Sequence, residues 1–207
     1  MGGHEAGDVA SRMIVEAMGE VDSQGRLSSL LDDVEDRLLE VNSRIYHGGT
    51  MRATPVTMGS TVAALLATGH YCLSVWAGDS RVYRYRNNEL EQITRDHSQT
   101  EKLIQEGKLR REAADGHPDA HVITRAVGGG PRLFLESELK KIRDGDRYLL
   151  CSDGLNKELG DSEIGEGLGV GNCAAACSHL VNLALKRRCV DNVTAIVVQF
   201  DETRQWN

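Results

Sequence analysis

The stretch that most constrains this chain is residues 149–155, in which an apolar run ends abruptly at an acidic residue followed by glycine. The run predicts a buried strand that reaches the surface at Asp153 and turns at Gly154. A carboxylate at the end of a rigid strand is well placed to hold a hard cation, because its backbone is fixed while its oxygens face solvent. Taken alone, the pattern is more often an ordinary aspartate that hydrogen-bonds its own turn.

Two other segments repeat this pattern. An apolar strand predicted over residues 71–77 is broken by glycine and then Asp79, and Asp191 directly precedes a β-branched strand predicted over residues 192–200. Three separate strand ends therefore each present an aspartate. If those ends meet in space, the carboxylates form an oxygen-rich site that suits Mg²⁺ or Mn²⁺ rather than zinc.

Length and charge narrow the class of protein. The 207 residues suffice for one domain with a sizeable core, so we expect a single domain over residues 1–207. A net charge of −7 argues against a general nucleic-acid or anionic-membrane binder, and no apolar run approaches the roughly 20 residues that span a bilayer. We expect no signal peptide, because the opening is not a basic segment followed by an apolar one. No C-x-x-C pair occurs, and the five cysteines are interpreted as reduced thiols of a cytoplasmic protein.

The periodicity of the apolar residues predicts an order of elements. Two amphipathic helices come first, over residues 9–17 and 29–46, and Gly48-Gly49 is expected to end the second. An antiparallel meander follows, with Asn87-Asn88 as a hairpin turn. Its strands are predicted at residues 61–68, 71–77, 81–86 and 89–93. The remaining elements are a helix at 99–106, strands at 134–142, 147–151 and 192–200, and helices at 161–166 and 172–187.

Taken in order, seven short motifs resemble those of the PPM-type metal-dependent protein phosphatases, also called the protein phosphatase 2C family, in its bacterial single-domain form. They are Gly2-Gly3-His4-Glu5-Ala6-Gly7, Met58-Gly59-Ser60-Thr61, Ala77-Gly78-Asp79-Ser80-Arg81-Val82-Tyr83, Thr94-Arg95-Asp96-His97-Ser98, Ile123-Thr124-Arg125-Ala126-Val127-Gly128-Gly129, Cys151-Ser152-Asp153-Gly154-Leu155 and Asp191-Asn192-Val193-Thr194. The resemblance implies an α+β fold, a four-layer α-β-β-α sandwich of two antiparallel sheets flanked by helices.

The resemblance also implies a reaction. Two divalent ions, Mn²⁺ or Mg²⁺, would activate a water that hydrolyses phosphoserine or phosphothreonine of a protein substrate, itself the product of a cognate kinase. By motif match, Asp153 and Asp191 would be catalytic metal ligands, Asp79 would belong with Asp153 to a third metal position, and Asn192 would help to orient ligands or water. A monomeric serine/threonine phosphatase is the implied protein.

Two departures from the family pattern stand out. In the family an Asp-Gly pair precedes the glycine-rich opening and its aspartate bridges both metals, whereas this sequence opens at Met1. We therefore expect this chain to lack a bridging ligand, a phosphate-binding arginine and the first strand or strands of a sheet. Many relatives carry a second acidic ligand four residues after Asp153. Lys157 stands there instead, and its charge opposes a third metal.

Other interpretations stay open. The missing Asp-Gly pair favours a catalytically impaired phosphatase-like module that binds a partner or regulates a kinase, and a hydrolase of small phosphoesters or a sporulation-type regulator phosphatase would share the metal chemistry. Arg81 and Arg125 are interpreted as structural partners of carboxylates rather than as phosphate ligands. Three histidines in polar stretches are assigned solvated roles: His97, His117 and His121.

Overall fold

The structure is a computed structural model that describes residues 3–22, 25–51, 54–114, 116–187, 189 and 191–201, with side chains from Ala6 onward. The chain forms two compact units, each built from several separate segments. The first comprises residues 1–62, 75–78 and 96–137, and the second comprises residues 63–74, 79–95 and 138–207. The prediction of a single domain over residues 1–207 stays a prediction. Met1, Gly2 and Trp206 lie outside the described residues.

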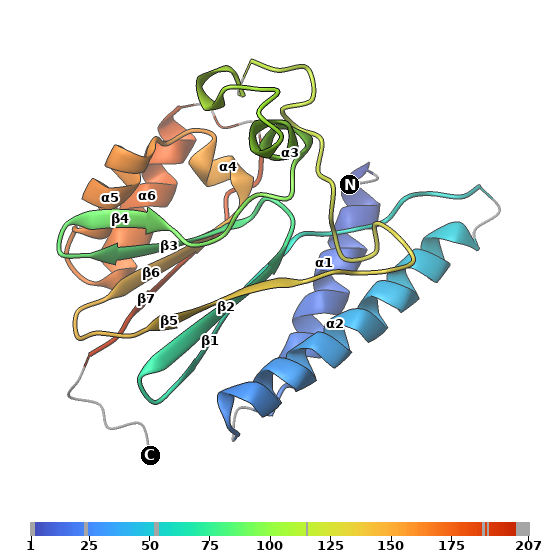
Figure 1. The fold of residues 1–207 in the computed structure, drawn as a ribbon, viewed down its shortest axis with the longest axis horizontal. Helices are drawn as coiled ribbons and strands as arrows, with labels where there is room; N and C mark the ends of the chain where they lie inside the picture. Colours follow the sequence, from blue (N-terminus) through green and yellow to red (C-terminus); the bar gives the residue numbers. More distant parts are fainter. Residues whose placement is uncertain are drawn as a thin grey trace. The chain divides into compact units, whose positions relative to one another are not determined.

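The second unit holds most of two sheets (Figure 1). One has the strand order β1-β2-β5, formed by Val62–Thr68, Tyr71–Ala77 and Glu136–Lys141. The other has the order β4-β3-β6-β7, formed by Glu89–Gln92, Arg81–Arg86, Arg147–Cys151 and Ala195–Gln199, and all its pairs are antiparallel. The meander predicted over residues 61–93 is therefore wrong as a single sheet, because the chain changes sheets between β2 and β3.

Strand β6 is buried on both faces, and its side chains alternate between two apolar clusters. Tyr148 and Leu150 join Val82 in a cluster that also includes Cys72. Leu149 and Cys151 point the other way. There they pack against residues of α4 (Asp153–Asn156), α5 (Asp161–Leu168) and α6 (Cys173–Lys186) and of the segment between α4 and α5: Leu155, Leu159, Ile164, Leu168, Leu180 and Ala184. This alternation explains why the sequence shows a continuous apolar run at the end of β6.

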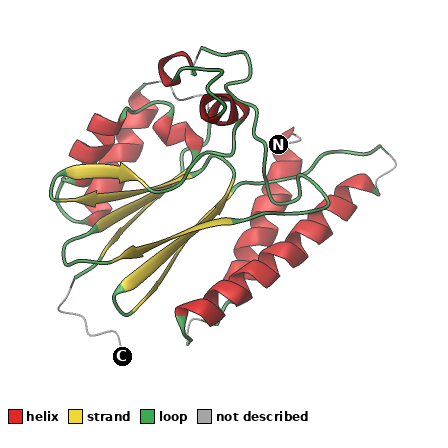
Figure 2. Ribbon diagram, viewed as in Figure 1, coloured by secondary structure: helices red, strands yellow, loops and turns green. Residues whose placement is uncertain are grey.

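The first unit contains a pair of helices, α1 (Gly3–Gly19) and α2 (Leu27–Thr50), which pack against each other (Figure 2). It also contains α3 (Gln99–Gln105) and a short 3-10 turn, η1 (Arg111–Ala113). The predicted end of the second helix at Gly48-Gly49 is wrong, since α2 continues to Thr50. A Cβ on Gly49 would lie 2.4 Å from the carbonyl oxygen of Val56, so this glycine permits close approach of the next segment.

Buried Asn42 joins α2 to the glycine-rich segment of the same unit. Its side chain is 2% exposed. Its Oδ1 accepts a 2.7 Å hydrogen bond from the N–H of Gly128, and its Nδ2 donates one of 3.1 Å to the carbonyl of Gly130. Gly128 has a φ of +86°, and a Cβ there would lie 2.2 Å from Cγ2 of Ile45. These bonds replace the regular pairing that such an irregular backbone lacks.

Other predicted elements agree closely with the structure. β2, β3 and β6 have the predicted bounds, and the Asn87-Asn88 turn is confirmed by φ values of 52° and 64°. All five cysteines are free, and Cys72 and Cys151 are buried in strands β2 and β6. None of the helices in the described part of the chain has the length and apolarity needed to cross a membrane.

Replacing Asn42 with Ala should lower the free energy of unfolding by about 2 kcal/mol, because the buried N–H of Gly128 and the half-buried carbonyl of Gly130 lose their bonds to this side chain. Urea denaturation would measure the change. Glu40→Ala is the matched control on the exposed face of α2 and should change the free energy by no more than about 0.5 kcal/mol. Equal stability of the two variants would contradict this role for Asn42.

Candidate metal centre

The pairing register of β3, β6 and β7 brings three strand ends to one edge of the sheet. Arg81 pairs with Cys151 on one side, and Cys151 pairs with Ala195 on the other. Because neighbouring strands are antiparallel, β3 starts, β6 ends and β7 starts at the same edge. Asp79 lies two residues before Arg81, and Asp153 lies two residues after Cys151. The pairing register therefore places both aspartates at this edge of the sheet.

Asp191 reaches the same edge through the segment that precedes β7. The Oγ of Ser152 donates to the carbonyl of Asn192 at 3.1 Å and accepts from the N–H of Thr194 at 2.9 Å. The Sγ of Cys189 lies 3.2 Å from the carbonyl oxygen of Gly154. These contacts hold residues 191–194 against the beginning of α4. Sequence reasoning missed the parts that Ser152 and Cys189 play, because no local pattern marks them.

Gly154 is the point of closest approach between these two segments. A Cβ on Gly154 would lie 2.5 Å from the carbonyl oxygen of Asn192 and 3.6 Å from Cβ of Asp191. The predicted turn at Gly154 is wrong, because α4 begins at Asp153 and includes Gly154. Glycine is required here because another backbone packs against it. Asp153 and Asp191 consequently belong to segments in direct contact.

Lys157 contacts one of the three aspartates, Asp153. Its Nζ is 2.5 Å from Oδ2 of Asp153, one helical turn earlier. Burial lowers the pKa of the Lys157 ammonium. The hydrogen bond to Asp153 and the negative charges of Asp153, Asp79 and Asp191 raise this pKa by a larger amount, so that it lies above its ordinary value. All three carboxylates thus act on one ammonium group. Convergence of the three carboxylates on one ion stays a prediction.

The donor set suits a hard divalent cation in kind, since carboxylate oxygens are the ligands that Mg²⁺ and Mn²⁺ favour. Within the described ranges, however, no group of three or more His, Cys, Asp or Glu side chains is placed to hold a metal ion. Asp191 uses its Oδ1 to accept a 2.8 Å hydrogen bond from the N–H of Asn192. The roles of Asp79, Asp153 and Asp191 as metal ligands therefore stay a prediction.

His97 corrects another expectation, because it is buried rather than solvated, with 6% exposure. Its ring stacks on Trp76, and its Nδ1 accepts a 3.1 Å hydrogen bond from the N–H of Gly78. The hydrogen therefore sits on Nε2, 3.2 Å from Oε1 of Glu136. Burial and the nearby charge of Arg125 lower the pKa of His97, although Glu136 opposes them. His97 is thus held neutral.

This histidine fixes the backbone just before Asp79. Its own N–H donates to the carbonyl of Gly78 at 2.9 Å, so both polar groups of Gly78 bond to one residue. Arg125 donates to Oε1 of Glu136 at 2.8 Å, in line with its predicted role as the partner of a carboxylate. The TRDHS motif in the sequence marks this buried cluster rather than a solvated loop.

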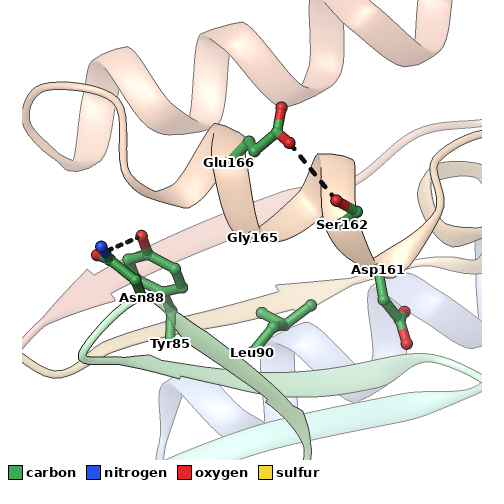
Figure 3. A pocket seen from close by; sticks show the side chains of 7 residues that line it. All are labelled: Tyr85, Asn88, Leu90, Asp161, Ser162, Gly165 and Glu166. Carbon is green, nitrogen blue, oxygen red and sulfur yellow. Dashed lines mark hydrogen bonds between the residues drawn. The ribbon is translucent and has the colours of Figure 1, made fainter.

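A cavity of about 480 Å³ lies between α5 and the β3–β4 hairpin (Figure 3). It is lined by Tyr85, Asn88, Leu90, Asp161, Ser162, Gly165 and Glu166. Figure 3 shows that the carboxylates of Asp161 and Glu166 point in different directions, so they do not converge on one ion. The cavity contains none of the predicted site residues.

Comparison with known proteins identifies the class. Residues 1–166 match the family model described as Protein phosphatase 2C. The chain therefore belongs to the protein phosphatase 2C family. It is 38% identical over 200 residues to the serine/threonine protein phosphatase PstP of Mycobacterium tuberculosis, in a match that covers 95% of this chain and 38% of PstP. The chain thus spans little more than a third of that relative.

Two solved structures support the fold. PppA, described as a key regulatory component of T6SS in Pseudomonas aeruginosa, has 40% sequence identity and a TM-score of 0.88 over 96% of this chain and 82% of its own. The catalytic domain of PstP in complex with two manganese ions has 35% identity and a TM-score of 0.85 over 98% and 85% of the respective chains. The predicted class, an α+β sandwich of two antiparallel sheets flanked by helices, is confirmed.

Gly154→Ala should displace the segment that carries Asp191 and Asn192, because the new Cβ meets a backbone carbonyl that cannot rotate away. We expect the free energy of unfolding to fall by about 1–3 kcal/mol. The amide resonances of Asn192 and Thr194 should shift in ¹H–¹⁵N spectra. Gly48→Ala, where the added Cβ meets nothing within 4 Å, is the control. Unshifted resonances in the Gly154 variant would refute the close contact.

Proposed function

We propose that this chain carries the catalytic part of a metal-dependent protein serine/threonine phosphatase. The observation that supports the proposal most directly is the common sheet edge at which β3 begins, β6 ends and β7 begins, next to Asp79, Asp153 and Asp191 in the sequence. The three acids stand in motifs that occur in the family order, and the relative PstP is a serine/threonine protein phosphatase. A phosphatase of this class requires an acidic edge that binds divalent metal.

In this proposal Asp153 and Asp191 hold Mn²⁺ or Mg²⁺, and Asp79 contributes beside Asp153. The metal, when bound, lowers the pKa of a water and offsets the charge of the phosphoryl oxygens. The protein's own part is to keep the carboxylates in place. Ser152 and Gly154 fix the segment of Asp191, whereas His97 fixes the residue that precedes Asp79. Asn192 completes this frame through its backbone.

A second candidate is a phosphatase-like module that binds a partner without catalysis. It is favoured by the finding that the described side chains form no closed set of three metal-binding groups. Calorimetry with Mn²⁺ separates the two functions, because a binding module need not hold metal. A hydrolase of small phosphoesters would hold metal as well and would differ only in failing to act on phosphoproteins.

The substrate and setting follow from the same proposal. The substrate is a protein phosphorylated on serine or threonine, and a cognate kinase supplies it. We propose a monomeric enzyme in the cytoplasm, whose reducing conditions suit five free cysteines. An acidic chain of net charge −7 accords with a protein substrate rather than a nucleic acid.

Phosphate release from p-nitrophenyl phosphate and from a phosphoserine protein should depend on Mn²⁺ and stop when the metal is chelated. Asp153→Asn should lower kcat/KM at least about 100-fold, because it replaces a charged ligand by a neutral amide. Asp161→Asn, an exposed aspartate that lines the separate cavity, is the matched control and should retain activity. Full activity of the Asp153 variant would show that the assigned role is wrong.

A further inference from the structure

We propose that Lys157 is a tethered competitor for metal at Asp153, so that a divalent cation binds Oδ2 of Asp153 only after the lysine ammonium has left it. The inference rests on the proposed function, because it takes Asp153 as a metal ligand. It concerns how strongly this particular chain binds its metal. A lysine at this place provides positive charge before any metal arrives and must be displaced when metal binds.

The geometry of α4 places the lysine here. Asp153 is the first residue of α4 and Lys157 is its C-cap, so the two side chains lie one turn apart on the same face. The N–H of Lys157 also donates to the backbone carbonyl of Asp153 at 2.9 Å, which fixes the lysine backbone relative to that aspartate. Only the flexible side chain has to move for the ammonium to leave.

The ammonium and a metal bound at Asp153 would share one ligand oxygen. The ammonium nitrogen lies 2.5 Å from Oδ2, whereas a metal ligated by a carboxylate lies about 2.0–2.2 Å from its oxygen. A metal on the same oxygen would then lie close to the ammonium, and the two positive charges would repel each other strongly in a partly desolvated site. Metal and lysine therefore compete for Oδ2.

The surrounding charges explain why the lysine occupies this position. Asp79 and Asp191 attract the ammonium as well as Asp153. Without a cation, three carboxylates held together by strand ends would repel one another. The Lys157 side chain is 39% exposed and that of Asp153 is 24% exposed, so solvent can reach the pair and exchange is possible. Lys157 thus stabilises the metal-free site and weakens metal binding by the same contact.

The test is calorimetric titration of Mn²⁺ into the full chain and its Lys157→Gln variant. The variant should bind Mn²⁺ at least about fivefold more tightly, since one competing charge is gone. Its thermal midpoint without metal should be lower than that of the wild type, and saturating Mn²⁺ should reverse the order. Lys157→Arg retains a positive charge and should bind Mn²⁺ with close to wild-type affinity.

Arg12→Gln is the matched control for the change in net charge. Arg12 makes the same kind of pair, with Asp8 one turn earlier on α1, but both side chains are 66% exposed. Its loss should leave the Mn²⁺ affinity unchanged. If wild type and Lys157→Gln bind Mn²⁺ equally, the competition proposed here is overturned while the metal site stands. If neither binds Mn²⁺, both this inference and the proposed metal role are overturned.

Discussion

The hydrogen-bond register around Cys151 is the constraint on which the candidate site depends. Cys151 has a partner on each side, Arg81 in β3 and Ala195 in β7. A slip of one residue in either ladder would turn every side chain of that strand to the opposite face. The two apolar clusters on either side of β6 oppose such a slip, since each needs its own alternate set of side chains. By fixing the register, the packing of the core also determines where each aspartate lies at the edge of the sheet.

Rigid strands alone do not complete the site, because each aspartate lies beyond the end of its strand. Local hydrogen bonds fix the backbone between the end of each strand and its aspartate. On one segment the two polar groups of Gly78 bond to His97. After β6, the hydroxyl of Ser152 bonds to the backbone of Asn192 and Thr194, in the segment that leads into β7. Such contacts restrict the carboxylates more than loops of the same length would.

The sequence was sufficient to predict the elements whose signal is local. The bounds of β2, β3 and β6 and the Asn87-Asn88 turn follow from apolar runs and from residues that tolerate positive φ. The division of residues 61–93 between two sheets could not be predicted, because alternation does not specify which strands pair. Burial of His97 was missed for a related reason. Its partners Gly78 and Glu136 are 19 and 39 residues away, and no local pattern marks them.

The acids at the site illustrate the same limit. Their position at strand ends is visible in the sequence. That these ends lie at one edge follows from the pairing register, which spacing along the chain does not specify. Of the glycines beside them, Gly154 was interpreted as a turn residue and Gly78 as a break after a strand. Gly154 instead makes room for the carbonyl of Asn192, and Gly78, with a φ of +120°, makes room for Thr61, whose Cγ2 would be 2.3 Å from an added Cβ.

An Asp-Gly or Gly-Asp pair after an apolar strand therefore has two physical origins that a sequence does not distinguish. In one, glycine supplies backbone freedom for a turn. In the other, glycine removes a side chain so that a second backbone can pack against the segment that bears the acid. Gly154 shows the second origin, with a helical backbone and a carbonyl at contact distance. Only this second origin brings a further chain segment beside the acid, and that segment carries Asp191.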